Sequence, residues 1–216
     1  MKQQVLIFDL DGTLIDSRQD LATGINLMRR HYGLEPLSVA TVTGFVGEGV
    51  RNLVERSLQD AVFAVDLDEA VRLNGEFYRQ HIHDATMLYP GVRTGLGRLA
   101  AAGHVLALLS NKPGAASREI LRHFEIETLF ASIIGGDSGI PLKPDPEAIF
   151  TILRAVNGQR DNAWMVGDNH TDMAAAHRAG IHSIFVTYGI GALGAETPEL
   201  TVAGFDEVAE LFLRNS

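Results

Sequence analysis

Residues 5–17 read VLIFDLDGTLIDS, and this stretch decides how the rest of the chain is interpreted. Its apolar start, residues 5–8, predicts a short buried strand. Two carboxylates follow at Asp9 and Asp11, and Gly12 then allows the backbone to turn sharply. Open α/β sheets bind ligands beyond the carboxyl ends of their strands, and two close carboxylates favour a cation or a shared proton. The stretch therefore predicts a catalytic or metal site, with an ordinary Asp-Gly turn as the alternative.

The composition indicates an acidic, folded protein. The chain has 216 residues, of which 46% are apolar and 21% charged, so it can form a large core. The net charge of −9 disfavours nucleic acid and anionic membranes as partners. The absence of cysteine excludes disulfides, thiolate zinc sites and a cysteine nucleophile. No apolar run approaches membrane-spanning length, and the first one is too short for a signal peptide, so we expect a cytoplasmic protein.

The predicted elements follow two different patterns along the chain. Residues 15–88 show helical periodicity only, interrupted by a glycine-rich loop at 43–49. After that segment, short apolar runs alternate with helical stretches. These runs lie near residues 105–109, 132–135, 163–166 and 183–186. Such alternation predicts an α/β fold with a Rossmann-like parallel sheet and helices on both faces. We therefore predict a core of residues 1–14 and 89–216, with an inserted all-helical cap domain of residues 15–88.

Polar residues close to the later predicted strands can meet Asp9 at one edge of the sheet. They are Ser110, Asn111, Lys143, Asp168 and Asp172. Three converging aspartates would repel one another, and a hard divalent cation such as Mg²⁺, which takes oxygen ligands and bridges to phosphate, would compensate them. Lys143 adds a further positive charge. The set predicts a site for magnesium and phosphate, although singly Ser110 and Asp168 can be helix caps and Lys143 a surface lysine.

In order along the chain, these residues resemble the motifs of the haloacid dehalogenase superfamily, in its phosphatase branch with a helical cap. The DLDGT sequence at residues 9–13 is similar to the first motif, and LLSN at 108–111 to the second. Lys143 corresponds to the third motif, and GDNHTD at 167–172 to the fourth. The resemblance extends over almost the whole chain. It implies a magnesium-dependent phosphomonoester hydrolase that forms an aspartyl-phosphate intermediate.

The resemblance also implies a role for each motif residue. Asp9 is expected to attack phosphorus, and Asp11 to protonate the leaving oxygen and then accept a proton from water. Lys143 is expected to offset negative charge. Hydrogen bonds to the phosphoryl group are expected from Thr13, from Ser110 and from the backbone near Asn111. The magnesium ligands are expected to be Asp9, the Asp11 backbone carbonyl, Asp168 and Asp172, the last one directly or through water.

Within the predicted cap, the glycine-rich loop and Arg51 are the expected substrate contacts. Gly47 allows close approach of the backbone, and Arg51 can bind a carboxylate or phosphate. A plain turn and a surface arginine are the alternatives. Phe45 is the only aromatic residue of the loop, so nothing there suits a nucleobase. We expect a small anionic phosphomonoester, and the resemblance suggests 2-phosphoglycolate as the best single candidate.

Other functions share parts of this pattern. A phosphotransferase of the beta-phosphoglucomutase type, or another small-molecule phosphatase, would use the same core residues with a different cap. A dehalogenase would need no metal and would lack the second acid, Asp11. A phospho-accepting signalling module also gathers acids, a lysine and a hydroxyl on a parallel sheet, but it would have neither Asp11 nor a large cap. The expected partner is a small phosphate ester, and the expected state is a monomer or homodimer.

Overall fold

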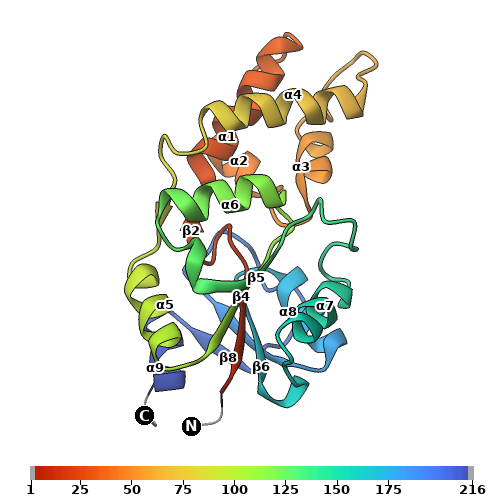
Figure 1. Ribbon diagram of the computed structural model, residues 1–216. Coiled ribbons are helices and arrows are strands. Elements are labelled where there is room, and N and C mark those ends of the chain that lie inside the picture. Colours follow the sequence, from red (N-terminus) through yellow and green to blue (C-terminus); the bar gives the residue numbers. More distant parts are fainter. Residues whose placement is uncertain (1–2, 214–216) are drawn as a thin grey trace.

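A six-stranded parallel sheet forms the centre of the computed structural model, which describes residues 3–213 (Figure 1). Its strand order is β5-β4-β1-β6-β7-β8, and every neighbouring pair is parallel. The strands are β1 (Val5–Phe8), β4 (Val105–Leu109), β5 (Phe130–Ile134), β6 (Ala163–Gly167), β7 (His182–Val186) and β8 (Leu200–Val202). This architecture confirms the predicted Rossmann-like α/β fold, although the sequence pattern did not indicate β8.

Helices cover both faces of the sheet, so the central strand β1 is fully buried. They are α5 (Val92–Ala101), α6 (Gly114–His123), α7 (Glu147–Ala155), α8 (His170–Ala179) and α9 (Phe205–Leu213), with short 3₁₀ turns at Glu127–Leu129 and Arg160–Asn162. Leu6 and Phe8 pack in the cluster that contains α5 and α9, and Val5 and Ile7 in the one that contains α7 and α8. Burial on both faces explains why residues 5–8 are all apolar.

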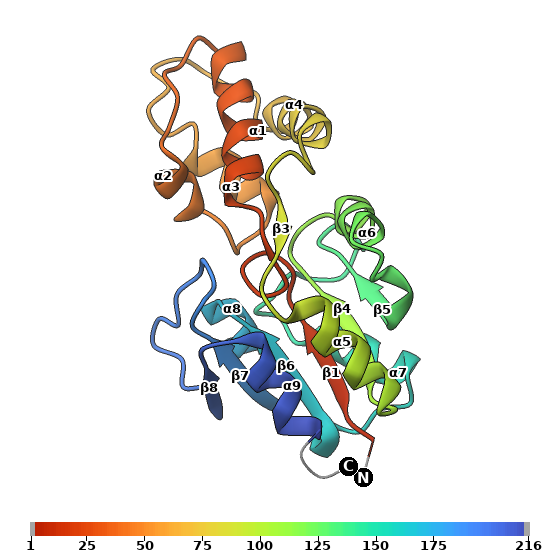
Figure 2. The same ribbon diagram turned by 90° about the vertical axis from the view of Figure 1, so that its left-hand side faces the viewer.

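Four helices lie between β1 and α5 in the sequence, above the carboxyl ends of the strands (Figure 2). They are α1 (Arg18–His31), α2 (Val39–Thr43), α3 (Val50–Arg56) and α4 (Leu67–Gln80). Their apolar residues belong to the same buried cluster as one face of the sheet. We call this segment, residues 15–88, the predicted cap, since its division from the core as a separate domain stays a prediction.

Two short strands connect the predicted cap to the core. β2 (Ile15–Asp16) and β3 (Met87–Leu88) pair in antiparallel fashion, so the expectation of an all-helical segment was wrong at its two ends. Two-residue strands are too short to show a period. The buried Asp20 carboxylate reinforces the connection by accepting hydrogen bonds of 2.7–3.0 Å from Ala85 and Thr86. Across the described part of the chain, no helix has both the length and the hydrophobicity to cross a membrane.

Candidate active site

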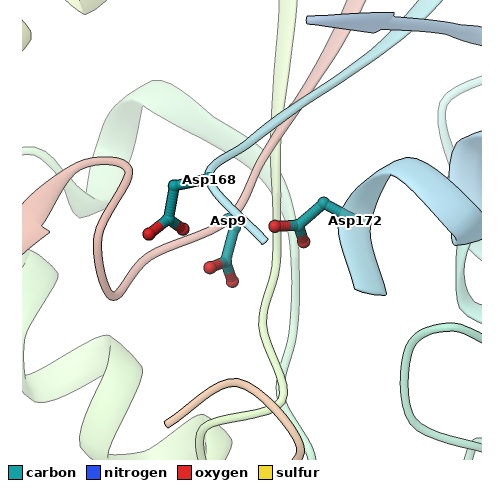
Figure 3. A group of neighbouring side chains, drawn as sticks. All are labelled: Asp9, Asp168 and Asp172. Atoms are coloured by element: carbon teal, nitrogen blue, oxygen red, sulfur yellow. The ribbon is translucent and has the colours of Figure 1, made fainter. Parts of the chain in front are cut away.

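Three carboxylates converge at the carboxyl edge of the sheet (Figure 3). Asp9 directly follows β1, Asp168 directly follows β6, and Asp172 lies in the first turn of α8. One oxygen from each lies within 4.8 Å of the others, and all three residues are at least nine-tenths buried. The structure therefore brings together the three carboxylates that were predicted as metal ligands. The ligand predicted from Asp11 is its backbone carbonyl, and the Asp11 carboxylate binds other partners.

Glycines in the motifs make room for these carboxylates. Gly12 has a φ of +86°, and a side-chain Cβ there would lie 2.0 Å from Asp168 Oδ2. A Cβ on Gly167 would lie 2.3 Å from the Asp172 side chain. The backbone N–H groups of Ile190 and Gly191 donate to Asp168 Oδ2 at 2.8 and 2.7 Å, which holds that carboxylate in place.

The Lys143 ammonium group donates hydrogen bonds to two of the three carboxylates. Its Nζ donates to Asp9 Oδ1 at 2.8 Å, to Asp172 Oδ1 at 2.6 Å and to the backbone carbonyl of Leu109 at 2.8 Å. Burial acts to lower the pKa of Lys143, but the charges of Asp172 and Asp9 outweigh it and raise that pKa. The lysine is therefore a fixed cation beside Asp9, as the sequence predicted.

One lysine does not neutralise three buried carboxylates. Burial, partly opposed by Lys143, raises the pKa of Asp9 to about 6. Burial also raises the pKa of Asp168 to about 7, with repulsion from Asp9 and Asp172 adding to the effect. A divalent cation would let all three remain ionised. The donors are hard carboxylate oxygens, which fit Mg²⁺.

The predicted phosphate-binding residues lie around this cluster. Thr13 is buried, and its Oγ1 donates to Asp168 Oδ1 at 3.3 Å. Ser110 is buried at the end of β4 and accepts from the backbone N–H of Lys112 at 3.3 Å. The Asn111 side chain instead bonds the backbone N–H and carbonyl of Lys143, both at 2.9 Å, so it orders the lysine segment. Any contact between Asn111 and a phosphoryl group would have to come from its backbone.

A cavity of about 220 Å³ separates this cluster from the predicted cap. Gly47 lines the cavity, and its carbonyl accepts from Asn111 Nδ2 at 2.8 Å. Arg51 does not line it, which corrects the sequence-based expectation. The Arg51 side chain is 61% exposed and pairs with Asp68. The α3 residues that line the cavity are Val50 and Leu53, which are three residues apart and share one face of the helix. Arg51 lies on another face.

The family model described as haloacid dehalogenase-like hydrolase matches residues 6–186. The chain belongs to this family. Phosphoglycolate phosphatase from Chromobacterium violaceum is 35% identical over 213 residues, which are 97% of this chain and 95% of that protein. The Vibrio cholerae protein of the same name is 38% identical over 192 residues, 86% of this chain and 85% of that one.

Solved structures agree with the family assignment. A crystal structure from Haemophilus somnus, titled a predicted phosphoglycolate phosphatase, is 28% identical, covers 98% of both chains and has a TM-score of 0.90. The four motifs of this haloacid dehalogenase-like hydrolase meet as the resemblance implied. The first follows β1, the second ends β4, the third precedes α7 and the fourth extends from the end of β6 into α8. The predicted membership of the superfamily is confirmed.

Sequence reasoning missed one buried cation of this haloacid dehalogenase-like hydrolase, Lys112. Its Nζ donates to Asp11 Oδ1 at 3.0 Å and Oδ2 at 3.2 Å, and it lies 4.5 Å from the centre of the Tyr78 ring. The Ser17 hydroxyl donates to the same Asp11 carboxylate at 2.5 Å. The available signal was its position three residues after the end of β4 and two residues after Ser110. Asp11 is therefore held by partners outside the three-carboxylate cluster.

Proposed function

We propose that this haloacid dehalogenase-like hydrolase is a magnesium-dependent phosphatase for small phosphomonoesters, with 2-phosphoglycolate as the best candidate substrate. The observation that carries the proposal is the Asp9 carboxylate, which borders a cavity between Lys143 and two further buried aspartates. A nucleophile, a fixed cation and a set of oxygen ligands are the parts that phosphoryl transfer needs. The names of the full-length relatives support the same activity.

Asp9, Asp168 and Asp172 are the side chains that would hold the metal, together with the backbone carbonyl of Asp11. When bound, Mg²⁺ supplies positive charge and orients the phosphoryl group. Asp172 accepts from Lys143 through Oδ1 and from the backbone N–H of Asn169 through Oδ2 at 3.0 Å. Asp172 thus orients Lys143 through Oδ1, and its proposed contact with the metal is direct or through water.

The reaction has two steps at phosphorus. In the first, a carboxylate oxygen of Asp9 attacks phosphorus while the bond to the leaving oxygen breaks, and Asp11 gives that oxygen a proton. In the second, water attacks the aspartyl-phosphate, Asp11 takes its proton, and inorganic phosphate leaves with Asp9 restored. Lys143 orients Asp9 by one oxygen and offsets the charge of the phosphoryl group. Thr13 and Ser110 are the proposed hydroxyl donors to that group.

The size of the cavity favours a small substrate. At about 220 Å³ it is smaller than the roughly 300–1,000 Å³ of typical ligand pockets. A nucleotide would exceed it, whereas a two-carbon phosphate ester would not. Gly47 stays a proposed substrate contact because it lines the cavity. The cytoplasmic location and a monomeric or homodimeric state stay predictions.

A substrate panel tests the proposal. We expect hydrolysis only with Mg²⁺, and a higher kcat/KM for 2-phosphoglycolate than for sugar phosphates, pyrophosphate or nucleoside monophosphates. Full activity in excess chelator would refute the metal dependence. If several of the other esters rank above 2-phosphoglycolate, the proposed substrate is wrong while the phosphatase proposal stands.

A further inference from the structure

Helix α4 carries two buried side chains that each have a polar atom without a hydrogen-bond partner. Asn74 is 4% exposed and Tyr78 is 8% exposed, and both line the cavity. Asn74 Oδ1 and the Tyr78 hydroxyl make no hydrogen bond to any part of the chain that the structure describes. The two residues are four apart on a helix, so they lie on the same face. A buried polar group without a partner destabilises a fold, and such groups in a cavity indicate a ligand that completes them.

The core side of the cavity adds a buried cation beside these two groups. Lys112 lies over the Tyr78 ring and pairs with Asp11. Burial raises the pKa of Tyr78 to about 12, so its hydroxyl is neutral and can donate. At Asn74 the atom without a partner is Oδ1, an acceptor, so the amide must flip to present its NH₂ group at that point. In the first proposed step Asp11 carries a proton, so the Lys112 ammonium then has no counter-charge there. Together with the two neutral donors it favours an anion.

The position of these groups defines which part of a substrate they would meet. Asp11 is the proposed acid for the leaving oxygen, and Lys112 contacts Asp11 directly. An anion beside Lys112 therefore lies on the leaving-group side of the cavity, away from the three carboxylates. Resting on the proposed phosphatase function, we propose that Asn74, Tyr78 and Lys112 form a subsite for a carboxylate on the leaving group of the substrate. The substrate class is then short phosphorylated hydroxy acids.

Two substrates that differ in one group provide the test. In 2-hydroxyethyl phosphate, a hydroxymethyl group replaces the carboxylate of 2-phosphoglycolate. The readout is the ratio of kcat/KM for the two esters, measured with Mg²⁺ on the wild type, Tyr78→Phe and Asn74→Leu. Each variant removes a hydrogen bond to a charged group, so we expect the ratio to fall about ten-fold or more in each, mainly through KM for 2-phosphoglycolate. Gln80→Ala, an exposed position on the same helix that does not line the cavity, should keep the wild-type ratio.

Thermal unfolding separates this role from a structural one. Because neither Asn74 Oδ1 nor the Tyr78 hydroxyl has a partner in the free protein, Asn74→Leu and Tyr78→Phe should keep or raise the Tm. A large fall in Tm for both variants would show that these groups serve the fold and would overturn the subsite.

The outcomes also distinguish this proposal from the proposed function. A wild type that hydrolyses neither ester would refute the proposed function. A wild type that hydrolyses both without preferring 2-phosphoglycolate would refute the subsite and the proposed substrate, while the phosphatase proposal stands. A wild type that prefers 2-phosphoglycolate, with both variants retaining the preference, would refute only the subsite.

Arg79 is an exposed cation at the cavity that makes no ion pair within residues 3–213. If Arg79→Gln alone abolishes the preference, the carboxylate binds there and the assignment to Asn74, Tyr78 and Lys112 is wrong.

Discussion

Removal of divalent metal is expected to make the protein lose stability as the pH rises from 5 to 7.5. The cause is the excess of negative charge at Asp9, Asp168 and Asp172, which Lys143 compensates only in part. Burial raises the pKa of Asp9 from 3.8 to about 6 and that of Asp168 to about 7. The folded protein therefore keeps protons that the unfolded chain has already released. The free energy of unfolding then falls with rising pH between 3.8 and 7.

The size of the effect follows from the same values. For each pH unit over which the folded protein keeps a proton that the unfolded chain has released, the free energy of unfolding falls by about 1.36 kcal/mol. Between pH 5 and 7.5 this range is about one unit for Asp9 and about two for Asp168, which gives about 4 kcal/mol. Saturating Mg²⁺ should remove most of this loss, since ligation favours the ionised carboxylates.

Urea unfolding in excess chelator and in Mg²⁺, at both pH values, measures the effect. Asp168→Asn is the matched control, because the amide oxygen can still accept from Ile190 and Gly191 while the charge is removed. In chelator at pH 7.5 this variant should be more stable than the wild type and should respond weakly to Mg²⁺. If the metal-free wild type is equally stable at pH 5 and 7.5, or if Asp168→Asn has the same pH dependence, the inferred excess of buried charge is wrong.

Five further substitutions, at four positions, test the proposed chemistry. Asp9→Asn should abolish turnover, whereas Asp11→Asn should slow both steps, and near-normal rates for Asp9→Asn would exclude the covalent route. Lys143→Met should lower kcat roughly 10²–10³-fold, and Lys143→Arg, which keeps the charge, should recover part of it if charge is what matters. Gly12→Ala should cost about 1–3 kcal/mol of stability from backbone strain and should also weaken Mg²⁺ binding, because the methyl group displaces Asp168; calorimetry would measure both.

The residues at the carboxyl edge of the sheet could be predicted from the sequence, because the patterns that indicate them are local. A continuous apolar run that ends in a carboxylate indicates a buried strand and a site at its end, which located Asp9 and Asp168. Arg51 was misplaced because which face of α3 meets the cavity depends on tertiary packing. Lys112 was overlooked because a single lysine after a strand usually points to solvent, and only Asp11 and Tyr78 make its burial favourable.

Polar contacts join the two sides of the cavity, and their strength bears on how the site opens. Asn111 Nδ2 joins the Gly47 carbonyl of the predicted cap to the segment that carries Lys143. The Lys112–Tyr78 contact is a second link between the two sides. A single hydrogen bond contributes about 0.5–1.5 kcal/mol, and a cation–π contact about as much. His83 of the predicted cap also stacks on His123, so opening the site would break these contacts together. A carboxylate bound between Lys112 and Tyr78 would strengthen the second link, so the substrate itself would favour closure over Asp9.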